Sequence, residues 1–80
     1  MTYKVEVLPI DLKGHRNDSV NCPVALALKR TFPVEKVCVG TNVMTIGKQT
    51  ILMPKKASDF VLSWDNGDEV GMLPTFYVNM

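Results

Sequence analysis

The sequence has little of what marks membrane or secreted proteins. No apolar run approaches the roughly 20 residues that a transmembrane helix needs. Residues 1–6 carry an acidic side chain early and alternate with the period of a strand, which is not the pattern of a signal peptide. These absences predict a protein of the cytoplasm that does not enter a membrane.

Cysteine and histidine are scarce. The 80 residues include two cysteines, Cys22 and Cys38, and one histidine, His15. None stands in the CxxC or HxxxH spacing of a zinc site, so the sequence predicts neither a metal nor a cofactor. Two thiols without a secretion signal favour a reduced setting over a disulfide bond.

An excess of charge of one sign is also lacking. Nine basic and eight acidic residues give a formal net charge of +1. This small charge excludes a large uniform electric field that would attract the whole molecule to nucleic acid or to an anionic membrane. The basic residues are scattered among acids, which disfavours nucleic-acid binding. Base stacking on strand aromatics such as Tyr3 and Tyr77 stays open until their faces are known.

What is present suits one folded domain, residues 1–80. The apolar share of 46% argues against disorder. A chain of this length buries only about 60% of the surface that its unfolded form exposes, so its stability margin is small. We therefore expect a homo-oligomer. The chain has no internal repeat and no low-complexity stretch.

Alternating apolar residues predict five strands, at residues 3–8, 35–39, 43–46, 50–53 and 75–80. The first strand places Tyr3, Val5 and Val7 on one face. The connections at 40–42 and 47–49 have hairpin length, so the three middle strands are predicted to form an antiparallel meander. The polar segment 11–21 is predicted to be a loop.

Two segments predict helices. The first opens at Cys22-Pro23, because proline fits the first helical position, and Pro33 stops it. The second starts at Pro54 and ends at 66–67, where Gly67 suits a left-handed cap. Their apolar stripes are Val24, Ala25, Leu28 and Phe32, and then Ala57, Phe60, Val61 and Trp64. The order β-α-β-β-β-α-β predicts an α+β fold with one mainly antiparallel sheet and both helices on one face.

The chain resembles a group of small uncharacterised proteins of bacteria and their phages. The resemblance rests on CPVALALKR at 22–30, the valines of 35–39, Phe60 and the DNG turn at 65–67. It covers most of the chain from Gly14 onward, and CPVALA is its most specific part. Trp64 replaces the phenylalanine of the pattern and Tyr77 disturbs the final alternation. The resemblance implies no activity, but a phage setting in a host cytoplasm, where short chains act as inhibitors, sponges or accessory factors.

The loop that leads into the first helix is the candidate ligand site. A helix start presents unpaired N–H groups and about half a positive charge, which attract anions. Lys13, His15 and Arg16 add donors suited to phosphate, and Gly14 would let the backbone approach a ligand. The candidate residues are Lys13, Gly14, His15, Arg16, Asn17, Ser19, Asn21 and Cys22.

Simpler interpretations of these residues stay open. The loop could be only solvated, with Asp18 neutralising Arg16, and it holds no Walker or GxGxxG pattern. Cys22 stands where a helix start lowers a thiol's pKa, so a nucleophilic pair with His15 is conceivable. No third orienting group is evident, and we expect no enzyme. The acids Asp59, Asp65, Asp68 and Glu69 fit a solvated rim better than a metal site.

Two functions follow as hypotheses. The first is a non-enzymatic protein that captures a nucleotide-like or phosphorylated small ligand, such as a counter-defence sponge. The alternative is an inhibitor or adaptor that binds a host protein through a sheet edge or the surface of residues 72–80. Methionine suits adaptable contact surfaces, although core filling is the expectation for Met44 and Met53.

Overall fold

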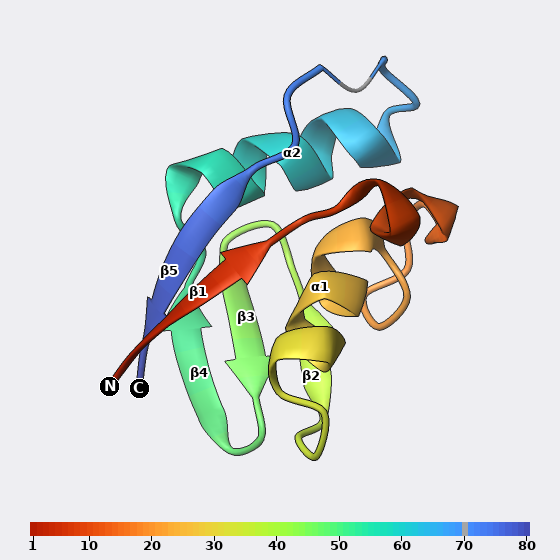
Figure 1. Ribbon diagram of the computed structural model, residues 1–80. Coiled ribbons are helices and arrows are strands. Elements are labelled where there is room, and N and C mark those ends of the chain that lie inside the picture. Colours follow the sequence, from red (N-terminus) through yellow and green to blue (C-terminus); the bar gives the residue numbers. More distant parts are fainter. Residues whose placement is uncertain (70) are drawn as a thin grey trace.

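The computed structural model describes residues 1–69 and 71–80 and confirms the α+β class (Figure 1). The predicted order of strands and helices is present, with one 3₁₀ helix, η1, in addition. The elements are β1 Thr2–Glu6, η1 Pro9–Lys13, α1 Pro23–Thr31, β2 Val37–Val39, β3 Val43–Ile46, β4 Gln49–Leu52, α2 Lys55–Asp65 and β5 Thr75–Asn79.

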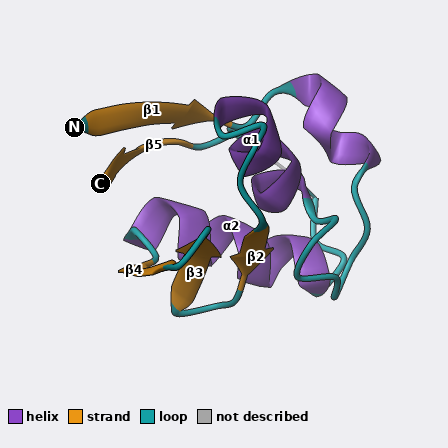
Figure 2. Ribbon diagram, turned by 90° about the horizontal axis from the view of Figure 1, so that it is seen from below, coloured by secondary structure: helices purple, strands orange, loops and turns teal. Residues whose placement is uncertain are grey.

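The strands form two antiparallel sheets where one was predicted. The meander β2-β3-β4 is confirmed as one sheet, and β1 pairs with β5 in the other. Figure 2 shows the β1–β5 pair on one side of the molecule and the meander on the other. Apolar alternation identifies the buried face of a strand but not its neighbour, so it could not separate two sheets from one.

Helix α1 bridges the two sheets, since it contacts both β1 and β2. Helix α2 contacts β5 and α1. The helices therefore do not share one face of a single sheet as predicted. Both apolar stripes are buried, as the helical spacing indicates. No helix within residues 1–69 and 71–80 is long and apolar enough to cross a membrane.

The core lies between the inner faces of the two sheets and the two helices. Val5, Leu28, Met44 and Ile46 are at most 1% exposed. Val7 is also buried and Tyr3 half-buried, so the face that Tyr3, Val5 and Val7 were predicted to share is the inner one. The methionines divide as expected, because Met44 and Met53 are core while Met72 is exposed.

Part of the predicted loop 11–21 is ordered by a buried acid. Asp11 lies in η1 and is 3% exposed, although a solvated loop was predicted there. Its carboxylate accepts a hydrogen bond from the Leu8 N–H at 2.8 Å and from Arg30 Nη1 at 2.6 Å. Arg30 Nη2 also donates to the Glu6 carbonyl at 2.6 Å. Arg30 thus ties α1 to both η1 and β1.

Candidate functional site

The predicted 13–22 loop is held against α2. Trp64 Nε1 donates to the His15 carbonyl at 3.0 Å, and the guanidinium of Arg16 lies 4.5 Å from the Trp64 ring centroid. The Asn17 N–H donates to Asp65 Oδ1 at 2.8 Å. Arg16 is therefore stacked on α2, and its role in this structure is a cation–π contact.

Asp18 organises the second half of the loop. Its carboxylate accepts the N–H of Val20 at 3.0 Å and that of Asn21 at 3.1 Å, and lies 3.5 Å from His15 Nδ1. The hydrogen bond from Val20 is the main reason that the pKa of Asp18 is lowered, with those from Asn21 adding to it. Asp18 thus partners His15 and its own turn, not Arg16 as one interpretation suggested.

Seven of the eight predicted site residues line two separate hollows, and Arg16 lines neither. One, of about 270 Å³, is lined by Lys13, Gly14, His15, Asn21 and Leu26. Beside it, Lys29 Nζ donates to Asn21 Oδ1 at 3.3 Å. The other, of about 230 Å³, includes Asn17, Ser19 and Cys22 among its lining residues. His15 and Cys22 line different hollows, so this structure does not present them as a nucleophilic pair.

Gly14 packs closely against the backbone of Asn21 and Cys22. A Cβ at this position would lie 2.6 Å from the Asn21 carbonyl oxygen and 2.9 Å from the Cys22 carbonyl carbon. The Gly14 N–H already donates to the Asp11 carbonyl at 3.0 Å, and the His15 N–H to the Asn21 carbonyl at 2.8 Å. These two amides are therefore not free to bind an anion.

The start of α1 is buried. Cys22 is the N-cap residue and is 2% exposed, while Val24 and Ala25 are fully buried. Burial raises the pKa of the Cys22 thiol, opposite to the direction that a helix start alone would give. The helix terminus is thus inside the core, while Cys38 is the exposed thiol.

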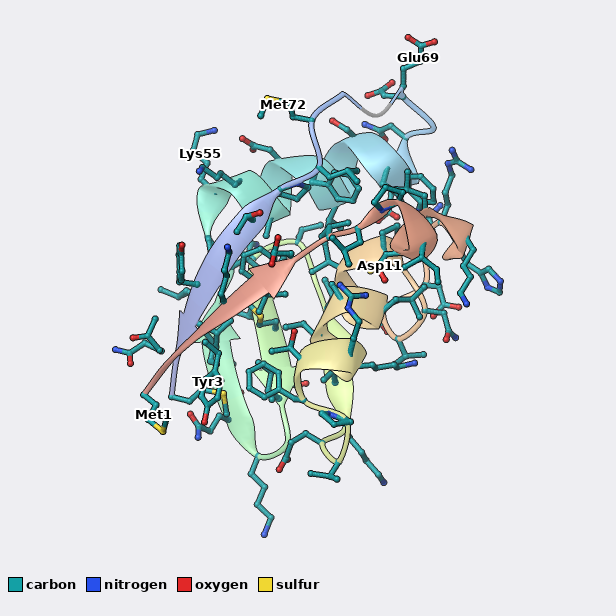
Figure 3. All side chains as sticks on the ribbon, viewed as in Figure 1. Met1, Tyr3, Asp11, Lys55, Glu69 and Met72 are labelled. Atoms are coloured by element: carbon teal, nitrogen blue, oxygen red, sulfur yellow. The ribbon has the colours of Figure 1, made fainter. Side chains whose placement is uncertain are left out.

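A larger hollow than these two lies elsewhere, with a volume of about 480 Å³. We call it the α2–β5 groove. It is lined by Lys56, Asp59, Phe60 and Ser63 of α2 and by Glu69, Gly71, Met72, Leu73, Pro74 and Thr75. In Figure 3 the labelled Met72 lies between Lys55 and Glu69, along the side of the molecule that α2 occupies.

The groove combines an apolar base with a charged rim. Phe60 is 9% exposed and stacks against Trp64, whereas Met72 is 94% exposed. Lys56, Asp59 and Glu69 are the charged lining residues. Asp59 Oδ2 also lies 2.9 Å from Nζ of Lys55, outside the groove, and this hydrogen bond raises the pKa of Lys55. The rim therefore carries both signs of charge around an apolar hollow.

The chain matches no protein-family model, no curated protein and no solved structure. The resemblance to small bacterial and phage proteins therefore stays a prediction, and function is argued from geometry. Among residues 1–69 and 71–80, no group of three or more histidine, cysteine or acidic side chains could hold a metal ion.

Only part of the groove could be found from the sequence. The surface of residues 72–80 was one of the predicted contact regions, and it supplies Met72 to Thr75. The residues contributed by α2 were missed, because Phe60 was assigned to the core and the polar residues to a solvated face. The available signal was Met72-Leu73-Pro74, an apolar run outside any predicted helix or strand.

Proposed function

We propose that this domain binds a partner protein, as an adaptor or inhibitor, and does not catalyse a reaction. The α2–β5 groove is the observation that carries the proposal, because it is larger than the two hollows beside the 13–22 loop and its base is apolar. Exposed apolar side chains that surround a hollow mark interaction surfaces. Met72 supplies a flexible side chain that can adapt to a partner.

The mixed rim also fits a protein partner. Lys56 and Glu69 line the groove with opposite charges, which suits a peptide surface that carries both signs. A large apolar side chain of the partner would enter the hollow above Phe60, and polar groups around it would meet the rim.

A displayed library of random ten-residue peptides, selected on the purified protein, tests the proposal. We expect the enriched peptides to share a large apolar residue, and we expect Met72→Asp to weaken their binding about tenfold, as for a central contact residue. Leu52→Asp is the matched control, since Leu52 is 78% exposed on β4, outside the groove. The proposal fails if no peptide is enriched, or if Met72→Asp binds the peptides as wild type does.

Capture of a phosphorylated small ligand is the second candidate. It is favoured by Lys13 and His15 in one hollow, with Lys29 bonded to Asn21 beside it. Side chains would hold the phosphate there, because the amides of Gly14 and His15 are engaged. Such a sponge would suit the phage setting that the resemblance implies. Linear and cyclic nucleotides that leave the melting temperature unchanged would remove this candidate.

A further inference from the structure

The backbone of β5 presents a row of outward hydrogen-bonding groups. The Val7 N–H donates to the Pro74 carbonyl at 3.1 Å, and Met1 and Met80 are likewise bonded to each other. In an antiparallel pair, bonded and non-bonded residue pairs alternate. The backbone N–H and C=O groups of Phe76 and Val78 therefore point toward β1. The same groups of the alternate residues point away from β1, and these residues are Thr75, Tyr77 and Asn79.

This outer edge of β5 is open. Within residues 1–69 and 71–80 the sheet has two strands, and no further strand pairs with β5. In the described part of the chain, no hydrogen bond beyond the pairing with β1 reaches the backbone of Tyr77 or Asn79. Tyr77 is 62% exposed, and β5, TFYVN, contains neither a charge nor a proline.

The outer edge of β1 differs, because its backbone is hydrogen-bonded and its side chains include charges. There the Glu6 carbonyl accepts Arg30 Nη2 at 2.6 Å, and Lys4 lies 3.8 Å from Glu6 as an ion pair. Charged residues and covering groups are the usual protection of an exposed edge against pairing with another chain. Protection is present on β1 and lacking on β5, so β5 is the receptive edge of this sheet.

The open edge is continuous with the α2–β5 groove. Thr75 lines the groove and is also the first outward-facing residue of β5. The opposite side of the groove is formed by α2, with Phe60 at its base. A strand edge beside a helix, with a hollow between them, accommodates an extended peptide.

We infer that an extended segment of the partner protein binds here as a third strand, paired with the outer edge of β5. This inference rests on the proposed function and specifies its occupant. Side chains of a strand alternate between faces. Every second side chain of the added strand would lie on the same face as Phe76 and Val78, toward α2, where the hollow above Phe60 takes an apolar one.

Backbone methylation of the enriched peptides tests strand addition with the protein unchanged. An N-methyl group removes one N–H, and only alternate residues of an added strand direct that N–H toward β5. We expect binding to fall at least tenfold at every second position along the paired stretch and to be little changed between. Equal tolerance at all positions overturns the inference while leaving the groove proposal intact.

Amide hydrogen exchange in the full chain gives a second readout. The amides of Tyr77 and Asn79 are expected to exchange rapidly in the free protein and at least tenfold more slowly with peptide bound. Tyr77→Pro, which lacks the outward N–H, should weaken binding, whereas Tyr77→Thr, which keeps it, should not. Unchanged exchange with bound peptide contradicts strand addition. If exchange of these amides slows as the protein concentration rises without peptide, the edge pairs with a second copy of this chain. That result would also overturn the inference.

Discussion

Gly14 is a residue whose missing side chain allows the 13–22 loop to close. Its φ of −64° suits any residue, so the obstacle to a side chain is the backbone oxygen of Asn21 at 2.6 Å. We expect Gly14→Ala to lower the free energy of unfolding by about 2 kcal/mol, as overpacking does. Gly71→Ala is the control, because its Cβ would meet nothing within 4 Å. Equal urea midpoints for the two variants would show that the loop accepts the methyl group.

The Cys22 thiol gives a prediction that depends on pH. Burial raises its pKa above the ordinary value of 9.0, so the folded state holds this proton more tightly than the unfolded chain. The resulting stability is present below pH 9.0 and is lost as the pH rises through the folded-state pKa. Near pH 7.5, we expect iodoacetamide to modify exposed Cys38 at least tenfold faster than Cys22.

The single-thiol variants Cys22→Ser and Cys38→Ser separate the two rates by mass spectrometry. The first should react rapidly and the second slowly until urea unfolds it. A fast-reacting Cys22 in the folded protein would contradict its burial and revive the hypothesis of a cysteine nucleophile.

The partners of individual polar residues could not be predicted from the sequence. Arg16 was expected to face a phosphate, yet it lies over Trp64, which is 48 residues further along the chain. Asp11 was placed in a solvated loop, yet it is buried against Arg30. A charged side chain is stabilised by an opposite charge or by an aromatic face, and which of the two lies near it depends on the tertiary structure.

At the scale of elements, Arg30 joins α1 to η1 and β1. Arg30→Met would leave the Asp11 carboxylate, 4% exposed, without its cation. We expect a loss of about 2 kcal/mol in the free energy of unfolding, less than for a fully buried pair because 41% of the Arg30 side chain meets water. Lys36→Met, at an exposed position, should stay within about 0.5 kcal/mol. Equal urea denaturation curves for both variants would show that Asp11 does not need its cation.

The helices and strands themselves were largely predictable. Their apolar periodicity identified both helical stripes, and Pro23 and Pro54 stand at the predicted helix starts. The 3₁₀ helix at Pro9–Lys13 was missed because a short polar segment after a proline has no period that distinguishes it from a loop.

At the scale of the whole molecule, the fold class was predictable and the division of strands was not. The hairpin connections at 40–42 and 47–49 specify the meander locally. No local signal specifies that β1 pairs with β5, because their residues stand about 70 positions apart. The groove depends on that long-range pairing, since β5 forms one of its sides.

The pairing of β1 with β5 also has a consequence for synthesis on the ribosome. The meander can fold from contiguous residues as the chain emerges, whereas β1 is made before the meander and its strand partner after it. At cellular translation rates, the residues between Glu6 and Thr75 take on the order of ten seconds to add. During that time the strand that pairs with β1 does not yet exist, so Val5 and Val7 stay exposed to chaperones or to aggregation.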